Sequence, residues 1–150
     1  MATLLSNASQ FAPAAVRLGT TCCAFSTTSK LLEVRLLSRM RIVDNSAIGR
    51  AAAEIGKPPR VIHVYNKKQV GHLGDKVLVT VKGEMRRAYI VGLKQKQRPN
   101  VPRTDTNNIV LVDDNGNPLG NRVLVPIPSA LRANKKGDLT KVLSLATKFV

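Results

Sequence analysis

The sequence lacks the features that mark several common classes of protein. Its two cysteines, Cys22 and Cys23, are adjacent, so they offer neither a disulfide framework nor a zinc site. No apolar run reaches the roughly 18 residues that a membrane-spanning helix needs. Tryptophan is absent, and two Tyr and three Phe provide few rings on which bases could stack. These absences argue against a disulfide framework, a membrane-spanning helix and a single-strand binder that relies on stacking.

Acidic residues are scarce relative to basic ones. The 150 residues contain 9 Asp and Glu against 24 Lys and Arg, which gives a formal charge of +15. A compact domain with so much like charge repels itself unless a partner neutralises it. Nucleic acid is the most common such partner, because each phosphate that pairs with Lys or Arg also releases counterions. An anionic membrane surface is the alternative, but it usually calls for one basic helix or tail, whereas these bases are spread along the chain.

The constellations that catalysis and metal binding require are missing as well. His63 lies in an apolar run, which favours a core or interface histidine, and no cysteine after residue 30 completes a site with His63 and His72. Asp113 and Asp114 are neighbours in sequence, so in a strand they point to opposite faces and do not form an acid–base pair. The glycines are scattered singly, without a phosphate-binding loop. We therefore expect no catalytic residue, no metal and no cofactor.

The first 30 residues differ from the rest of the chain. They are rich in Ala, Ser and Thr, contain no acidic residue and carry only Arg17 and Lys30 as bases. This composition is typical of a mitochondrial transit peptide, which the membrane potential draws inward. We predict a transit peptide over residues 1–30, cleaved near Phe25, and a location in the mitochondrial matrix for the single domain formed by residues 31–150. A disordered N-terminal tail is the alternative.

From residue 36 onward the chain consists of short apolar runs separated by Gly, Pro and Asn. The runs are rich in Val, Ile and Tyr and only a few residues long, as β-strands are. Several short strands without a long helix between them predict a mainly-β fold, namely a small five-stranded β-barrel. The predicted strands are residues 40–43, 60–65, 76–82, 87–93 and 109–112.

A hairpin is predicted to extend the barrel after the last of these strands. The segment Asp114-Asn115-Gly116 favours a type I′ turn, because Asn-Gly readily adopts positive φ angles. The returning strand is expected at residues 122–125.

The C-terminal part, from about residue 129, is predicted to contain short helices. Pro126 and Pro128 end the preceding strand, and Ser129 is placed to cap a helical turn through Arg132. Apolar residues then recur at helical spacing, so one face of a helix is expected to pack on the barrel. They are Leu139, Val142, Leu143, Ala146 and Phe149.

Basic residues are densest between residues 82 and 103, where seven bases accompany one acid. The polar, proline-rich segment 94–103 is either a solvated loop or a loop that contacts phosphates. We favour phosphate contacts, because Gln and Asn add uncharged donors and the prolines limit the entropy lost on binding. Asp44 and Asn45 favour local turn hydrogen bonds, and Asn45 can in addition contact RNA. The residues predicted to bind RNA are Arg39, Arg41, Asn45, Lys67, Lys68, Lys82, Arg86, Arg87, Lys94, Lys96, Arg98, Arg103 and Asn107.

Several short motifs of the chain resemble those of a known family, the universal large-subunit ribosomal protein fourteen in its mitochondrial branch. They also follow one another in the same order as in that family. Each motif is weak alone, but together they cover about three quarters of the chain, from Met40 to Val150. The matching segments are residues 43–46 (VDNS), 70–75 (VGHLGD), 79–82 (VTVK), 105–111 (DTNNIVL), 115–122 (NGNPLGNR) and 141–146 (KVLSLA).

The resemblance implies a function and a set of partners. It implies a non-catalytic five-stranded β-barrel with short C-terminal helices, bound to large-subunit mitochondrial rRNA on the face that bridges to the small subunit. It further implies contacts with a neighbouring large-subunit protein, the nineteenth, and with a ribosomal silencing factor. The family's silencing-factor contacts correspond here to Asn121, Arg122 and Lys141.

The chain departs from the family pattern at some positions. Asn121 replaces the usual Thr, and the stretch of residues 50–59 is lengthened. Two other functions stay open at this point: a free RNA-binding barrel, such as an RNA chaperone or assembly factor, and an RNA-processing enzyme. The enzyme would need clustered acids, histidines or cysteines, which the sequence does not offer.

Overall fold

The computed structural model describes residues 33–95, 99, 104–134 and 137–150. The predicted transit peptide of residues 1–30 lies outside the described residues, so the division into a leader and one domain over residues 31–150 stays a prediction. Three of the predicted RNA contacts, Lys96, Arg98 and Arg103, also lie outside the described residues.

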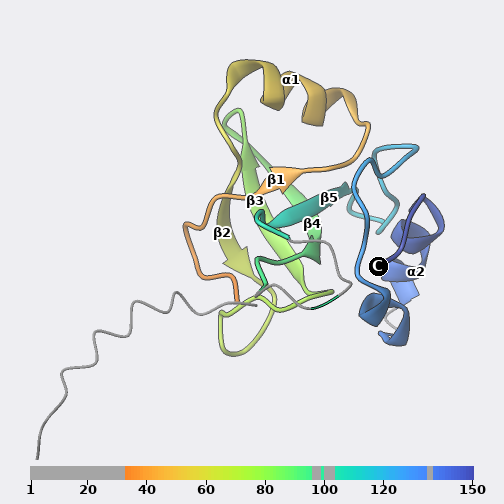
Figure 1. Cartoon of the computed structure of the whole chain (residues 1–150). Coiled ribbons are helices and arrows are strands. Elements are labelled where there is room, and N and C mark those ends of the chain that lie inside the picture. The colour runs from red at the N-terminus through yellow and green to blue at the C-terminus, as the bar shows by residue number, and fades with distance from the viewer. Residues whose placement is uncertain (1–32, 96–98, 100–103, 135–136) are drawn as a thin grey trace, which may run out of the picture.

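Five strands form one mixed sheet (Figure 1), which confirms the mainly-β prediction. β1 runs parallel to β5, and the other neighbouring strands are antiparallel. Alternate residues of the strands point to opposite faces, so a regular run of valines such as that in β3 buries one face. The strand order is β1 (Arg41–Ile42), β5 (Asn108–Val112), β4 (Glu84–Gly92), β3 (Lys76–Val81) and β2 (Arg60–Val64).

The barrel is less complete than predicted, because the backbone hydrogen bonds between the named strands do not close the sheet on itself. β1 and β2 are the two edges of the sheet. The described segment just before β1 pairs with the start of β2, where Arg39 and Arg60 form an isolated antiparallel bridge. The backbone N–H of Leu37 donates to the carbonyl of Val61 at 2.8 Å beside this bridge. β1 is only two residues long. The residues that pair with β5 and those that pair with β2 therefore form two successive short segments rather than one strand.

A β-bulge in β2 shows that His63 is not a core histidine, while the alternative of an interface histidine stays a prediction. The register between β2 and β3 shifts between Val61 and His63, so one extra residue is inserted. Val61 and Val64 are buried, whereas both residues between them are exposed. His63 therefore faces outward, where its ring contacts the ring of Tyr65 edge-on, with 5.3 Å between the centroids.

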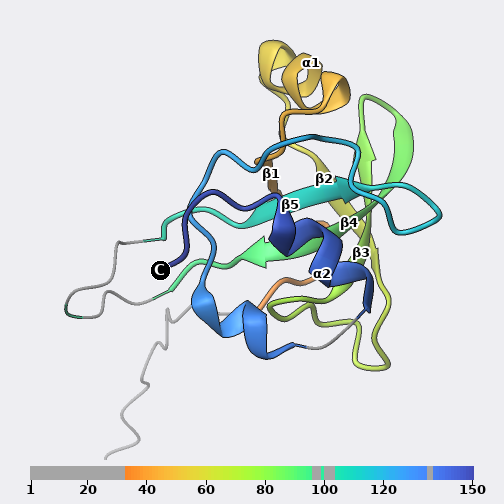
Figure 2. The ribbon, with the colours of Figure 1, turned by 90° about the vertical axis from the view of Figure 1, so that its right-hand side faces the viewer.

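A helix that the sequence analysis missed, α1 (Ala47–Ile55), lies between β1 and β2. Ser46 caps its start, because the Ser46 hydroxyl accepts the Gly49 N–H at 3.1 Å. Gly56 ends the helix with a left-handed φ of 71°. The lengthened stretch that departs from the family pattern is therefore largely helical. Figures 1 and 2 both show α1 at one end of the molecule, away from α2.

The hairpin after β5 differs from the predicted one. The N–H of Gly116 bonds to the carbonyl of Asp113, so the turn begins one residue earlier than a two-residue Asn115–Gly116 turn would. Gly116 has a φ of 75°, but Asn115 is not among the described residues with positive φ, so the turn is not type I′. The expected return strand at residues 122–125 does not pair with β5. Val123 forms isolated bridges with Asp44 and Ala146 instead.

The C-terminal part contains a 3-10 helix, η1 (Ser129–Ala133), and an α-helix, α2 (Gly137–Ser144), as predicted in outline. Ser129 is the first residue of η1 and makes no capping hydrogen bond with its side chain, because Pro128 occupies the cap position. Leu139 and Val142 are buried, as the helical spacing predicts. The helix ends at Ser144, so Phe149 is held differently: it forms a bridge with Ile127.

Two apolar cores lie on the two faces of the sheet. The inner core gathers the buried valines of β2 and β3 with Met40, Ile90 and Ile109. The second core packs the opposite face of β4 and β5 against the C-terminal part, including Val123, Leu131 and Leu139. Figure 2 shows α2 lying over this face of the sheet. Both faces of β5 are covered, which explains why all five of its residues are buried.

Candidate RNA-binding and partner-binding surface

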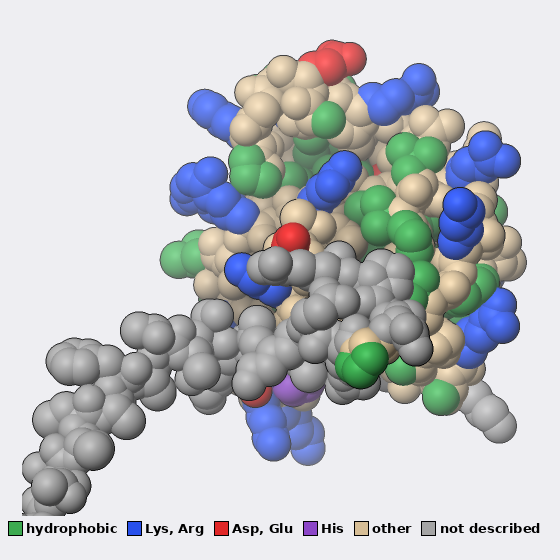
Figure 3. Space-filling view, viewed as in Figure 1, with side chains coloured by type: hydrophobic (Ala, Val, Ile, Leu, Met, Phe, Trp, Pro, Cys, Tyr) green, Lys and Arg blue, Asp and Glu red, His purple; other side chains and the backbone are tan. Residues whose placement is uncertain are grey.

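Most of the predicted RNA-binding residues that the structure describes reach solvent. Seven of them are exposed and three, Arg86, Arg87 and Asn107, are half-buried. Figure 3 shows Lys and Arg side chains distributed over one face of the molecule, with few carboxylates among them. The seven exposed residues are Arg39, Arg41, Asn45, Lys67, Lys68, Lys82 and Lys94.

Lys82 occupies the tip of the hairpin between β3 and β4. Val81 pairs with Glu84, so Lys82 and Gly83 alone form the loop. Both have positive φ angles, 53° and 91°, as the two central residues of a type I′ hairpin turn require. A lysine rarely adopts this conformation without cost, and here it presents its amine at an exposed tip.

Arg86 and Arg87 are already paired with carboxylates of the chain. Arg86 lies 2.8 Å from Glu84, and Arg87 lies 3.1 Å from Asp114 on the hairpin after β5. Both pairs are at the surface, where an ion pair contributes little stability. A phosphate at either arginine would therefore compete with a weakly held carboxylate.

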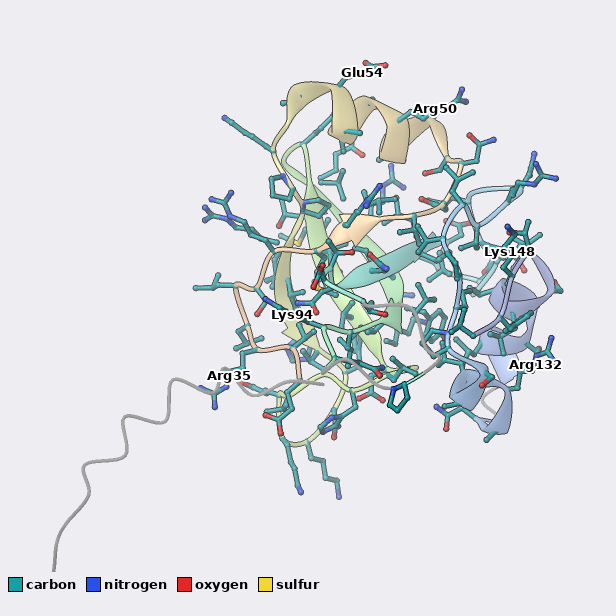
Figure 4. The ribbon with its side chains drawn as sticks, viewed as in Figure 1. Arg35, Arg50, Glu54, Lys94, Arg132 and Lys148 are labelled. Atoms are coloured by element: carbon teal, nitrogen blue, oxygen red, sulfur yellow. The ribbon has the colours of Figure 1, made fainter. Side chains whose placement is uncertain are left out.

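Lys94 and Asn107 lie at the base of the predicted RNA-binding loop. The backbone N–H of Lys94 donates to the side-chain oxygen of Asn107 at 3.0 Å. The N–H of Gln95 bonds to the carbonyl of Thr104, so the two arms of the loop are tied together where it leaves the sheet. Asn107 thus has a structural role, while the Lys94 amine remains exposed (Figure 4).

The turn of residues 44–46 joins β1 to α1, and the local turn hydrogen bonds expected of Asp44 and Asn45 stay a prediction. Ser46 caps α1, and the side chain of Asn45 is exposed. Asp44 is only 5% exposed, and neither of its carboxylate oxygens has a hydrogen bond of good geometry within the described chain. Burial raises the pKa of Asp44, although the nearby Ser46 hydroxyl and backbone groups of Asp44 and Leu111 favour the ionised form and offset part of the increase. The sequence around Asp44 contains no pattern that indicates its burial.

The predicted partner-binding corner, residues 120–122, packs directly on that turn. The N–H of Asn45 donates to the carbonyl of Arg122 at 3.0 Å. Gly120 fits only because it lacks a side chain, since a Cβ there would lie 3.0 Å from the Asn45 nitrogen and 3.0 Å from the Asp44 Cβ. Asn121 and Arg122 are exposed.

Lys141, the third predicted partner-binding residue, is exposed on α2. Its amine donates to the side-chain oxygen of Asn117 in the hairpin after β5, at 2.7 Å. The chain just after α2 is tied to the corner as well, because the N–H of Val123 bonds to the carbonyl of Leu145 at 3.2 Å. The corner and α2 are therefore neighbouring parts of one surface, although Arg122 and Lys141 are far apart in sequence.

Neither a metal site nor a membrane helix is seen in the part of the chain that the structure describes. No group of three or more His, Cys, Asp or Glu residues in it could hold a metal ion. No described helix is long and apolar enough to cross a membrane.

Comparisons with known proteins identify the family. Residues 33–150 match the family model of ribosomal protein L14p/L23e. The chain is 46% identical over 127 residues to "Large ribosomal subunit protein uL14m" of Danio rerio, covering 85% of this chain and 88% of the relative. The final letter of that name marks the mitochondrial form, so this match confirms the predicted mitochondrial branch and its location on the mitochondrial ribosome in the matrix. The family also confirms the prediction of a structural protein rather than an enzyme. The chain belongs to the ribosomal protein L14p/L23e family.

Proposed function

We propose that this chain, as a structural constituent of the mitochondrial large ribosomal subunit, binds rRNA mainly through phosphate contacts. Family membership carries the first part of this statement. The net charge supports the second, because residues from Glu33 onward contain 22 bases and 9 acids. Exposed loops at the two ends of β3 carry Lys67 and Lys68 at one end and Lys82 at the other. Because these loops project from the sheet, their amines can reach rRNA phosphates that do not lie directly against it.

The loop of residues 94–104 supplies the densest set of contacts in this proposal. Its two arms are tied at the base, at the end of β4, by the bonds at Lys94 and Gln95. The sequence adds three further basic residues to this loop, Lys96, Arg98 and Arg103. Arg39 and Arg41 lie on the segment that pairs with β2 and β5, and both are exposed. Contacts at both places would hold rRNA segments that converge on the sheet.

The corner of residues 120–122 and Lys141 form the proposed docking patch for a ribosomal silencing factor. Arg122 and Lys141 are exposed bases on neighbouring elements, which suits an acidic partner. Asn121 replaces the usual Thr between Gly120 and Arg122, and it keeps an uncharged polar side chain at the surface. Under this proposal the same subunit face bridges to the small subunit and contacts the nineteenth large-subunit protein.

The RNA-binding proposal is tested by the salt dependence of binding to large-subunit rRNA. Changing Lys94, Lys96, Arg98 and Arg103 together to Ala should flatten the log–log slope by about 0.7–0.9 for each phosphate that the variant no longer binds. The control changes Arg132 and Lys148 to Ala. These residues lie on the C-terminal part (Figure 4), and their replacement should leave the slope nearly unchanged. An equal slope for the wild type and the loop variant would show that the loop makes no phosphate contact.

A further inference from the structure

A groove with mostly apolar walls, here called the α1 groove, lies between α1 and the sheet. It encloses about 470 Å³, within the range of roughly 300–1,000 Å³ that ligand pockets occupy. Leu124 is 65% exposed, so one wall presents a large apolar side chain to solvent. Figure 3 shows apolar side chains beneath α1, close to basic ones. The apolar and small residues of its lining are Met40, Ile42, Gly49, Ala52, Ala53, Gly56, Pro58, Pro59 and Leu124.

Backbone hydrogen bonds hold the walls of the α1 groove in place. The N–H of Leu124 donates to the carbonyl of Val43 at 2.9 Å, and the N–H of Met40 donates to the carbonyl of Pro59 at 2.9 Å. Pro58 and Pro59 also restrict the chain where it returns from α1 to β2. The groove is therefore formed before a partner arrives, which lowers the entropy that binding costs.

The helix that forms one side of the groove is incompletely packed. α1 has nine residues, fewer than the roughly 12–15 at which an isolated helix becomes marginally stable in water, so it depends on tertiary contacts. Of its residues only Gly49 and Ala52 are buried, and Ile55 is exposed. α1 also covers much of the stretch that departs from the family pattern, so that pattern does not imply the groove. A partner in the groove would complete the packing of α1.

The charged groups around the α1 groove favour an acidic partner. Arg41 and Arg50 both line it and both are exposed. Asp44 is the one acid of the described lining, and its carboxylate is closed to solvent under α1, where a Cβ at Gly49 would lie 3.0 Å from Oδ1. Glu54 of α1 does not belong to that lining. A partner therefore meets two positive charges and no accessible carboxylate, which suits a negative group.

The same lining favours protein over RNA as the occupant. Recognition of an unpaired base combines stacking on aromatic rings or guanidinium planes with hydrogen bonds to the base edge. The described lining contains no aromatic ring, and Figure 4 shows Arg50 extending from α1 into solvent. Phosphates can pair with the two arginines, but they leave the apolar walls in water. An apolar side chain covers these walls, which is favourable in proportion to the area removed from water.

We propose that the α1 groove docks a segment of a neighbouring protein of the large subunit, which inserts one large apolar side chain between α1 and Leu124. A carboxylate close to that side chain pairs with Arg50. The ion pair is assigned to Arg50 because Arg41 is also a predicted RNA contact. The inference rests on the chain being part of the large subunit, and it adds a protein contact to the proposed rRNA contacts.

The test is photo-cross-linking within assembled large subunits. The full chain carries Leu124→benzoylphenylalanine, which the fold is expected to tolerate because the side chain of Leu124 is largely exposed. A second chain carries the same reactive residue at Ile55, an exposed residue of α1. The subunits are purified and irradiated, and the adducts are mapped by mass spectrometry. The adduct should lie on another protein, at a large apolar residue with an Asp or Glu close to it in sequence.

Two further changes, each combined with the reactive residue, assign the adduct to the groove. Ala53→Leu fills the groove from an exposed position of α1 and should abolish the adduct. Its control is Ala47→Leu, the same change at an exposed position of α1 outside the described lining, which should keep the adduct. Arg50→Glu should lower the yield, because it places a like charge against the carboxylate of the partner. Its control is Arg35→Glu, which reverses an exposed base far from α1 (Figure 4) and should keep the yield.

The outcomes separate this inference from the proposed rRNA binding. Adducts with rRNA alone, or no adduct in normally assembled subunits, contradict the protein-docking site and leave phosphate-mediated rRNA binding intact. A protein adduct that survives Ala53→Leu places the contact outside the groove. An unchanged yield with Arg50→Glu contradicts the ion pair with the partner. A wild-type chain that does not enter large subunits contradicts the proposed function together with this inference.

Discussion

The backbone N–H of Asn45 donates a hydrogen bond to the carbonyl oxygen of Arg122, with 3.0 Å between nitrogen and oxygen. This bond joins the turn between β1 and α1, which holds a predicted RNA contact, to the corner predicted to bind the silencing factor. The two motifs are separated by most of the sheet in sequence, yet they support each other in space. A change on one side of the bond should therefore be felt on the other.

The first prediction concerns Gly120, which makes this close packing possible. Gly120→Ala should destabilise the fold by about 1–3 kcal/mol, because the new methyl group meets backbone atoms that cannot rotate away. Chemical denaturation measures the free energy of unfolding. Gly56→Ala is the control: it has open space around it, so only the left-handed φ is strained, at a cost of about 1 kcal/mol. A stability equal to that of the wild type for Gly120→Ala would show that the corner does not pack as described.

The second prediction follows from the raised pKa of Asp44. Because burial disfavours the ionised carboxylate, that charge reduces the stability of the free protein at neutral pH. The destabilisation is relieved as pH falls through the raised folded-state pKa, where the carboxyl takes up a proton. Asp44→Asn, which is neutral at every pH, should thus be more stable than the wild type at pH 7, by on the order of 1 kcal/mol.

The pH dependence of that difference provides the check. The advantage of Asp44→Asn should shrink as the pH falls through the folded-state pKa, and level off below the ordinary value of 3.8. The control is Asp113→Asn, the same chemical change at an exposed carboxylate, measured over the same pH range. A variant less stable than the wild type at pH 7 would indicate that the ionised Asp44 stabilises the free chain.

The third prediction tests the docking patch. The double reversal Arg122→Glu with Lys141→Glu should abolish silencing-factor binding while the protein still assembles into large subunits. Like charges across the interface then replace the attraction, and truncating a well-buried pair of this kind costs about 2–5 kcal/mol. The reversal also removes the 2.7 Å bond between Lys141 and Asn117, so thermal stability is measured in parallel.

A pull-down of assembled subunits with the silencing factor decides this prediction. Lys148→Glu reverses one exposed charge in the segment that follows α2, and should leave binding unchanged. Undiminished binding by the double variant would mean that the patch does not carry the interaction in this protein.

The sequence was informative where a local pattern determines local structure. The alternating valines of residues 77–81 predict β3 closely, and the Asn115–Gly116 pair locates a turn. The prediction that this turn is type I′ was wrong, because the Gly116 N–H bonds to the carbonyl of Asp113 and the turn therefore begins one residue earlier than expected. The helix α1 was missed although Ser46, the alanines and Gly56 are strong local signals. The short apolar runs on both sides of this segment favour a fold made of strands alone, and that pattern conflicts with the local helix signals.

The remaining errors concern contacts between distant segments. Residues 122–125 have the composition of a strand, but Val123 pairs with Asp44 and Ala146 instead of with β5. The spacing of apolar residues in the sequence does not indicate which distant segment a strand pairs with. His63 faces solvent because of a bulge, which depends on how β2 and β3 align. The burial of Asp44 likewise arises only when α1 and the corner pack over the turn. Exposure of the predicted basic residues was easier to foresee, since a charged side chain seldom tolerates burial.

The central claim, that this chain is an rRNA-bound part of the mitochondrial large subunit, is tested most directly by sedimentation of a matrix extract on a sucrose gradient. The chain should migrate with the large subunit, and digestion with ribonuclease before centrifugation should move it to lighter fractions. A chain found at the top of the gradient without ribonuclease treatment, while other large-subunit proteins sediment normally, would contradict the account.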